Sequence, residues 1–224
     1  MCGRFVSSTP ASVLAAQFRV DEIRAAELPP RWNVAPTDEV LAVATGRGVR
    51  RLGSFSWGLL PGPGAARRLI NLRAETLATR PTFRRRLQRN RCVVPADGFY
   101  EWKVVAPGQP KVPYFISARD GRPLALAGLW GAVRQPDETW LRTCTILTGA
   151  PNDLVAGVHA RMPVILPEPA WEVWLDDTEE NVAALSALLV PAPSELLAMW
   201  PVGTAVNKVA HDGRELVTPA LSRK

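Results

Sequence analysis

The sequence predicts an α+β domain with a largely antiparallel β core flanked by short helices. Many short apolar or alternating stretches are separated by turn residues, a pattern typical of antiparallel sheets. They do not alternate regularly with helical stretches, which argues against a parallel βαβ arrangement. The 224 residues contain no low-complexity linker. We therefore expect a single domain over residues 1–224.

In the first half of the chain the sequence predicts one helix and then mainly strands. Thr9 as N-cap and Pro10 at the first helical position start that helix. Prolines favour an irregular segment at 31–37, because the residue before a proline is displaced from the helical region. The further elements expected here are strands at 40–44 and 49–59 around a turn at 46–48, a strand at 69–73, and a basic helix at 81–89.

The second half is predicted to pass from strands to helices. Strands are expected at 91–96, 98–103, 114–118, 124–130 and 140–147, because these stretches are rich in β-branched and aromatic residues. One helix is expected to begin at 151–153, a second to span 169–175, and a third to begin after Thr178, its N-cap. A helical segment is expected at 194–200. A short strand at 202–209 is expected to end the fold.

Composition limits the kinds of partner that the protein can have. The net charge is +6, and lysine occurs only at positions 103, 111, 208 and 224, so nearly all the positive charge is guanidinium suited to phosphate. Eight tryptophans add stacking surfaces of the kind that single-stranded nucleic acids use. With two histidines, three scattered cysteines and no glycine-rich phosphate loop, we expect no metal and no cofactor. No leader and no membrane-spanning run is visible, so we expect a cytoplasmic monomer.

Cys2 is the first candidate catalytic residue. If the initiator methionine is removed, Cys2 carries a free amine beside its thiol, and both groups titrate near neutral pH in water. Such an aminothiol can condense with an aldehyde to an imine, and the thiolate can then close a five-membered thiazolidine. An internal cysteine cannot do this, because its nitrogen is an amide.

Three further polar residues lie in stretches that are otherwise apolar. The alternation at 69–73 places Asn71 on the polar face of a strand, opposite the apolar face of Leu72. Glu101 lies between two aromatic residues, where burial would raise its pKa toward that of a general acid; a plain salt bridge is the alternative. We expect His159 on the same strand face as Arg161. A histidine can transfer protons there, although a lone histidine more often has a structural role.

Together these segments resemble one family, the SOS response-associated peptidases, which shield abasic DNA. The segments that carry the resemblance are Met1-Cys2-Gly3-Arg4-Phe5, Asn33-Val34-Ala35-Pro36-Thr37, Trp57-Gly58-Leu59, Asn71-Leu72-Arg73-Ala74-Glu75-Thr76, Arg91-Cys92-Val93-Val94-Pro95, Gly98-Phe99-Tyr100-Glu101-Trp102, Ala127-Gly128-Leu129-Trp130 and His159-Ala160-Arg161-Met162-Pro163. They follow the family order from residue 1 to about 210. Leu72 departs from the small residue usual in the family, and we expect it to pack inward.

The resemblance implies the family fold and a covalent crosslink to the aldehyde of an abasic site in single-stranded DNA. The family's nucleophile falls on Cys2, its sugar-positioning asparagine on Asn71, its acid/base glutamate on Glu101 and its histidine on His159. The implied DNA contacts are phosphate clamps at Arg4, Arg73 and Arg161, with Pro36 and Trp57 stacking on or wedging against bases. The protein would associate with the nucleoid when it is bound to DNA.

Three other interpretations remain open at this stage. A glutamine amidotransferase also begins Met-Cys-Gly, but it needs an Asn-Gly pair that this sequence lacks. A peptidase activity would be limited to removing the residue before Cys2. A non-catalytic single-strand binding module would explain the arginines and tryptophans, but not Cys2 together with Glu101.

Overall fold

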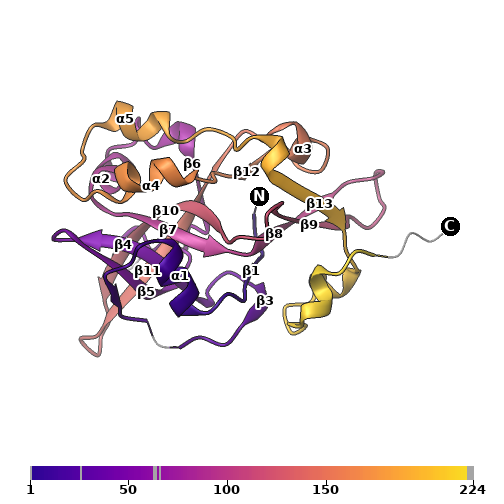
Figure 1. Cartoon of the computed structure of the whole chain (residues 1–224), viewed down its shortest axis with the longest axis horizontal. Coiled ribbons are helices and arrows are strands. Elements are labelled where there is room, and N and C mark those ends of the chain that lie inside the picture. Colours follow the sequence, from indigo (N-terminus) through magenta and orange to yellow (C-terminus); the bar gives the residue numbers. More distant parts are fainter. Residues whose placement is uncertain (1, 26, 63–64, 66, 221–224) are drawn as a thin grey trace.

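The computed structural model describes residues 2–25, 27–62, 65 and 67–220. It confirms the α+β class, because two largely antiparallel sheets form the centre and short helices lie outside them (Figure 1). Met1, whose removal the sequence analysis expects, lies outside the described residues.

The larger sheet has eight strands and curls into a barrel-like ring. Its path is β12-β11-β10-β7-β4-β5-β2, and β6 is added to β11. Parallel pairing of Cys144 in β11 with Trp57 in β5 joins two strands that are far apart on this path and so closes the ring. The strands are β2 (Glu22–Ile23), β4 (Glu39–Gly46), β5 (Val49–Trp57), β6 (Asn71–Arg73), β7 (Arg91–Ala96), β10 (Leu124–Arg134), β11 (Trp140–Gly149) and β12 (Met162–Pro163).

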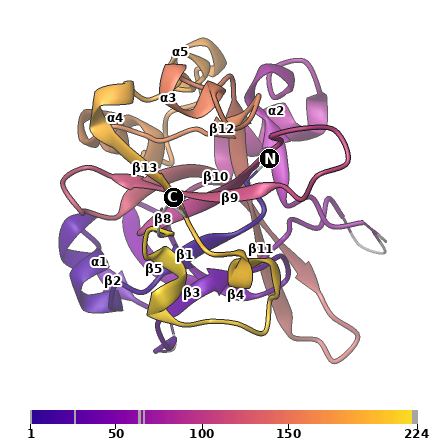
Figure 2. The ribbon, with the colours of Figure 1, turned by 90° about the vertical axis from the view of Figure 1, so that its right-hand side faces the viewer.

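The smaller sheet has five strands in the order β13-β9-β8-β1-β3. The chain leaves the ring at the end of β7 and enters this sheet as β8 after the single residue Asp97. The C-terminal 3-10 turns lie beside β3 (Figure 2). The strands are β1 (Phe5–Ser7), β3 (Arg31–Val34), β8 (Gly98–Lys103), β9 (Val112–Ala118) and β13 (Leu197–Pro201), and the 3-10 turns are η1 (Ala74–Thr76), η2 (Ser194–Leu196), η3 (Thr204–Asn207) and η4 (Arg214–Val217).

The helices are α1 (Ala11–Gln17), α2 (Pro81–Arg89), α3 (Asp153–Ala156), α4 (Glu168–Leu175) and α5 (Val182–Ala187). Arg91 ties two of them to the ring, since its buried guanidinium donates to the carbonyls of Leu87 in α2 and Trp174 in α4. These carbonyls at helix ends have no intrahelical donor, so a buried arginine satisfies them. Within the described residues, every helix is too short or too polar to cross a membrane.

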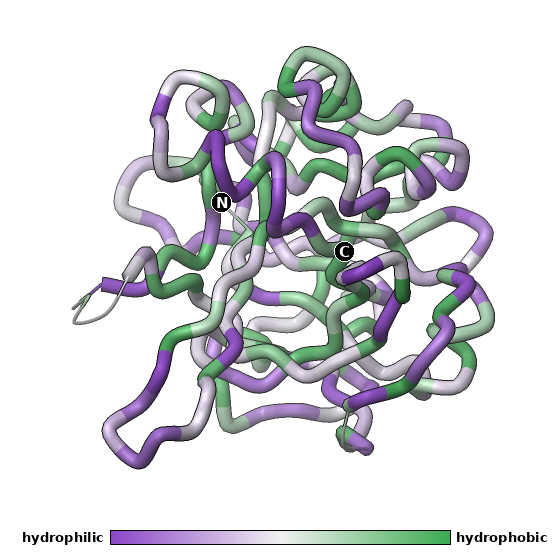
Figure 3. Tube along the Cα trace, turned by 90° about the vertical axis from the view of Figure 1, so that its left-hand side faces the viewer, coloured by the Kyte–Doolittle hydropathy of each residue, from purple (hydrophilic) through white to green (hydrophobic). Residues whose placement is uncertain are grey.

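The core follows the alternation of the strands. Apolar side chains fill the ring and the space between the two sheets, and the hydrophilic stretches lie mostly in outer loops and hairpin tips (Figure 3). Leu72 is buried, as expected for the apolar face of β6. The turn at 46–48 is confirmed as a tight hairpin: Arg47 and Gly48 have φ of 55° and 71°, the left-handed values that two-residue hairpin loops require.

Two predicted features of the N-terminal third are wrong. Residues 31–34 form strand β3 rather than an irregular segment, because Val34 pairs with Phe5 in β1. The strand ends before Pro36, where the restriction that proline imposes does act. Pro10, not Thr9, is the N-cap of α1. The Thr9 hydroxyl donates instead to Asp97 at the junction of the two sheets.

Three predictions near the C-terminus are also wrong. The cap of α5 is Asn181 rather than Thr178, and its side chain accepts from two backbone N–H groups of the first turn. Residues 197–201 form strand β13, because they pair along β9. The segment expected as a strand at 202–209 contains the 3-10 turn η3. In each case tertiary pairing or a local side-chain cap outweighs weak local propensity.

Candidate functional site

Cys2 lies just before β1 and has no exposed surface. The side-chain amide of Asn71 donates to the Cys2 carbonyl oxygen at 2.8 Å, so β6 of the larger sheet holds the short segment that precedes β1 of the smaller one. The Cys2 thiol lies 3.9 Å from the Arg4 carbonyl oxygen, a weak contact for a sulfur donor. The nucleophile expected from the sequence is therefore fixed where the two sheets meet.

Burial raises the pKa of the Cys2 thiol, and the negative charge of nearby Glu101 raises it further. The resting thiol is therefore protonated at neutral pH, in contrast to the partly ionised thiol expected for an exposed aminothiol. A group that accepts its proton is needed before the sulfur can act as a nucleophile.

Glu101 lies on β8 opposite Tyr114 of β9 and is 2% exposed. Burial raises its pKa, and the nearby His159 opposes that rise. The direction agrees with the sequence-based expectation, but the source of the burial differs. Tyr100 and Trp102 point to the other face of β8, where Tyr100 donates to the Trp32 carbonyl. Because neighbours along a strand alternate between its two faces, Tyr100 and Trp102 do not bury Glu101. Other parts of the fold, packed on the Glu101 face of β8, remove the carboxyl group from water.

His159 completes the group, but it lies in the loop between α3 and β12 and not in the strand expected from the sequence, because only Met162 and Pro163 pair with β11. Its Nδ1 lies 3.9 Å from Oε1 of Glu101, and its side chain is 30% exposed, so the pair is reachable from solvent on the histidine side. The backbone N–H of Arg161 donates to the same Nδ1 at 3.0 Å. The Arg161 carbonyl oxygen also lies 3.0 Å from Nδ1 and accepts from it when Nδ1 carries the proton, so both tautomers of the neutral ring have a backbone partner here. Cys2, Asn71, Glu101 and His159 are thus brought together from four separate stretches of the chain.

The three arginines expected to bind phosphate differ in how far they are already engaged. Arg4 donates to Asn33 Oδ1 at 2.8 Å and to the Val206 carbonyl at 3.0 Å. Arg161 makes a two-pronged ion pair with Glu75, at 3.0 and 2.9 Å. Arg73 is exposed at the end of β6, and its guanidinium makes no hydrogen bond or ion pair with another described residue, although its charge helps to lower the pKa of Glu75. A phosphate would have to compete with Glu75 for the fork of Arg161.

The structure corrects the expectation for Trp57. The ring has no exposed surface, donates to the Ile70 carbonyl at 3.0 Å and packs edge-on against Phe5. A buried ring offers no face for stacking on a base, so Trp57 supports the core and the strand that leads to Asn71. Pro36 remains at the surface, partly exposed, in the turn between β3 and β4.

Two residues that contribute to this site were not singled out from the sequence. Asn33 is fully buried and donates to the carbonyls of Lys208 and His211, while its oxygen accepts from Arg4. It therefore fixes Arg4 relative to the C-terminal segment. Glu75 holds Arg161. Both lie inside motifs used for the family resemblance, but no local pattern shows partners so distant in sequence.

Asn71 has one further property. Its Oδ1 is buried and has no hydrogen-bond partner among the described residues, while its Nδ2 holds Cys2. A buried acceptor without a donor costs free energy, so a ligand hydroxyl that donates to it would gain more than an ordinary hydrogen bond.

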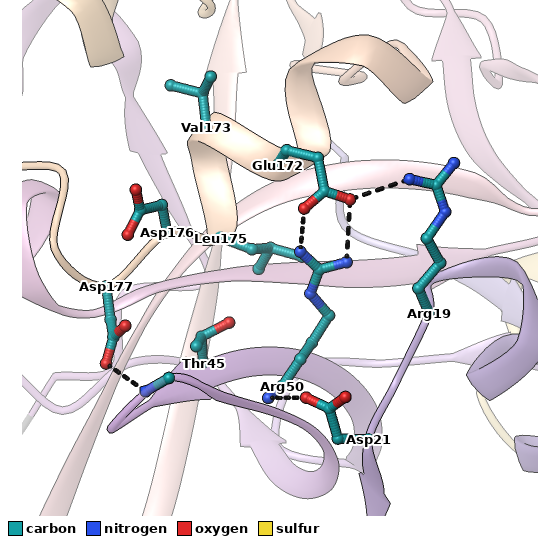
Figure 4. A pocket seen from close by; sticks show the side chains of 10 residues that line it. Arg19, Asp21, Thr45, Arg50, Glu172, Val173, Leu175, Asp176 and Asp177 are labelled. Carbon is teal, nitrogen blue, oxygen red and sulfur yellow. Dashed lines mark hydrogen bonds and ion pairs between the residues drawn. The ribbon is translucent and has the colours of Figure 1, made fainter.

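A separate pocket contains none of the expected site residues (Figure 4). Arg50 and Arg19 there both bind Glu172, and Asp21 accepts from the backbone of Arg50. Its charged side chains thus largely satisfy one another. Among the described residues, no three His, Cys, Asp or Glu side chains come close enough together to hold a metal ion.

Comparison with known proteins places the chain among relatives of the same length. Residues 1–209 match the SOS response associated peptidase (SRAP) family. The abasic site processing protein YoqW of Bacillus subtilis is 36% identical over 97% of this chain and 99% of its own length. YedK of Escherichia coli, which carries the same description, is 32% identical over 98% of this chain and 100% of its own length.

Solved structures give the same result for the fold. A crystal structure of a Bacteroides thetaiotaomicron protein superposes with a TM-score of 0.85 at 24% identity, covering 98% of this chain and 100% of that one. A Bordetella bronchiseptica protein gives 0.75 at 26% identity, over 90% of this chain and 100% of its own. With the family match over residues 1–209, the chain belongs to the SOS response associated peptidase family.

Proposed function

We propose that this protein processes abasic sites in single-stranded DNA by joining itself to them through Cys2 in a thiazolidine. The names of its relatives, abasic site processing proteins, support the substrate class. The observation that carries the chemistry is the arrangement around Cys2. The Asn71 side chain donates a hydrogen bond to the Cys2 carbonyl oxygen. Burial, and then the charge of Glu101, which pairs with His159, raise the pKa of the Cys2 thiol.

The proposed reaction consumes one aldehyde and releases one water. Removal of Met1 leaves the amine of Cys2 free, and this amine attacks the aldehyde carbon of the opened sugar. The hydroxyl of the resulting carbinolamine leaves as water and an imine forms. The sulfur then adds to the imine carbon as the thiol proton moves to a base and the nitrogen is protonated, which closes the five-membered ring.

Glu101 is the proposed acid and base of these steps. An abasic sugar is mostly a closed hemiacetal, so a proton must move before the aldehyde appears. Burial raises the pKa of this carboxyl group, so it keeps its proton to a higher pH than an exposed carboxyl group does and can supply it, and its carboxylate form can accept the proton of the thiol. The protonated thiol of Cys2 makes such a base necessary.

His159 and Asn71 have supporting roles. His159 touches the carboxyl group and is partly exposed, so it can pass protons between Glu101 and water during formation and reopening of the ring. Asn71 positions the backbone of Cys2, and its unpaired Oδ1 can accept a hydrogen bond from a sugar hydroxyl. Arg4, Arg73 and Arg161 would hold the neighbouring phosphates, and Pro36 would wedge against a base.

The proposal is tested by incubating the protein with single-stranded DNA that contains one uracil and has been treated with a uracil glycosylase, followed by a denaturing gel. Wild type should give a heat-stable shifted band. Cys2→Ala should give none, and Cys2→Ser at most a labile imine. Cys144→Ala, which removes another buried free thiol, is the matched control and should crosslink like wild type.

Two outcomes would contradict the proposal. A heat-stable adduct with Cys2→Ala would place the bond elsewhere. Full activity of a protein with an uncleavable extension before Cys2 would exclude the amine, because a peptide nitrogen is not a nucleophile. A second, cleavable extension tests the peptidase interpretation, since a chain that removes this extension itself would gain activity with time.

A further inference from the structure

A run of exposed arginines leads away from the candidate site along the chain. It starts at Arg73, two residues after Asn71, and continues through η1 to α2 with Arg80, Arg84 and Arg85. Within the part of the chain that the structure describes, none of these four side chains makes a hydrogen bond or an ion pair. We call these four residues the arginine track.

The lack of partners is not a general property of arginine in this protein. Most other arginines bind carboxylates or backbone carbonyls, as Arg50 binds Glu172 and Arg86 binds the Trp130 carbonyl. Helix α2 itself contains no acidic residue. Two acidic residues next to these elements already have partners: Glu75, two residues after Arg73, is held by Arg161, and Glu180 pairs with Arg89 of α2.

The positive charges of Arg80 and Arg84 lie at the N-terminal end of α2, where they do not stabilise the helix. Arg80 is the N-cap of α2, and Arg84 follows one turn later. Positive charge near a helix N-terminus is unfavourable because the helix dipole is positive at that end. Like charges four residues apart, Arg80 with Arg84, add a repulsion along the helix surface. Anionic groups bound beside these side chains would remove both penalties.

We propose that the arginine track binds the phosphates of the DNA strand that flanks the abasic site. The inference rests on the proposed function, since it takes the site at Asn71 as the place where the strand is held. Charge complementarity and continuity with that site identify the occupant. Arg73 is the last residue of β6, η1 follows it directly, and only residues 77–80 separate η1 from α2.

The track predicts that affinity depends on strand length as well as on the lesion. An oligonucleotide of a few residues would reach the site and Arg73 only, whereas a longer strand would also contact α2. Guanidinium groups contact phosphates without reading bases, so the extra affinity is independent of sequence.

The test compares two double variants that lower the net charge equally. Arg84→Ala/Arg85→Ala removes two arginines of the track, and alanine suits the helix. Arg47→Ala/Arg214→Ala removes two exposed arginines that also lack hydrogen-bond and ion-pair partners among the described residues but lie on the β4–β5 hairpin and in η4. Circular dichroism and thermal melts confirm that both are folded.

Binding to an undamaged single strand of about thirty nucleotides is measured by fluorescence anisotropy between 50 and 200 mM salt. Each phosphate contact on a single strand contributes about −0.7 to the slope of log affinity against log salt. The track variant should therefore show a slope shallower by about 1.4. Over this range wild type should lose about sevenfold more affinity than the variant. The control variant should keep the wild-type slope.

A wild-type slope in the track variant would overturn the proposal and leave the arginines as a solvated surface. If the salt slope became shallower by the same amount in both double variants, the proposal would also be overturned, since net charge alone would then explain the effect. Crosslinking of abasic DNA by wild type is measured separately. If wild type binds but forms no crosslink, the proposed function fails while the salt slopes still decide the role of the track.

Discussion

Substituting Glu101 with Gln separates a catalytic carboxyl group from a structural one. Glutamine keeps the shape of the side chain and one hydrogen-bonding oxygen, but it can neither donate nor accept a proton at neutral pH. General acid–base catalysis typically contributes 10²–10⁴-fold. The crosslinking rate should therefore fall by that factor, which corresponds to about 3–5 kcal/mol in the barrier. Binding to an undamaged strand should change little.

The same variant has a predicted effect on stability whose sign follows from the burial of Glu101. Because the folded-state pKa is raised, the folded protein binds this proton more tightly than the unfolded chain does. This contribution to stability is fully present below the unfolded pKa of about 4.3 and is lost as pH rises through the folded pKa. The glutamine side chain does not titrate, so Glu101→Gln should gain stability relative to wild type as pH rises from about 4 to 8.

The assay is urea unfolding of both proteins at several pH values, alongside crosslinking time courses at the same pH. Glu138→Gln is the control, because Glu138 is an exposed carboxylate whose side chain is 79% accessible. If wild type instead gains stability relative to Glu101→Gln with rising pH, partners stabilise the carboxylate and it is a salt-bridging residue. A wild-type crosslinking rate in Glu101→Gln would move the acid/base role to His159.

Two further substitutions test how the site is supported. Asn71→Ala removes the hydrogen bond to the Cys2 carbonyl, so it should lower the free energy of unfolding in urea by about 1 kcal/mol and slow crosslinking at saturating DNA. An unchanged crosslinking rate would mean that Asn71 does not position Cys2. Trp57→Phe loses the hydrogen bond to the Ile70 carbonyl at a buried position, which should lower the free energy of unfolding by about 1–3 kcal/mol. Its affinity for single strands should stay at the wild-type value, and a large loss of affinity would restore a DNA-contacting role for this ring.

Local sequence patterns predicted those parts of the site that depend on one strand at a time. The alternation at 69–73 correctly placed Leu72 inward, because a strand has only two faces and one of them was apolar. Glu101 lies in a predicted strand, and its pKa shifts in the predicted direction. The pattern did not show that its aromatic neighbours belong to the opposite face and that other parts of the fold bury it.

Features that depend on contacts between distant segments could not be predicted in this way. The pairing of Cys144 with Trp57 closes the ring and buries the tryptophan, although its strand alone gives no indication of which face would be interior. The ion pair of Glu75 with Arg161 joins residues 86 positions apart. It occupies a guanidinium fork that the sequence suggested for phosphate. Such pairings are set by tertiary packing and not by local propensity.

Intact mass spectrometry of the crosslinked product tests the central claim most directly. A thiazolidine formed by Cys2 requires a mass equal to the chain without Met1 plus the abasic strand minus one water. The adduct should survive heating without any reducing agent, and peptide mapping should locate the DNA on Cys2. An adduct that persists only after borohydride reduction, that retains Met1, or that maps to another residue would contradict the account.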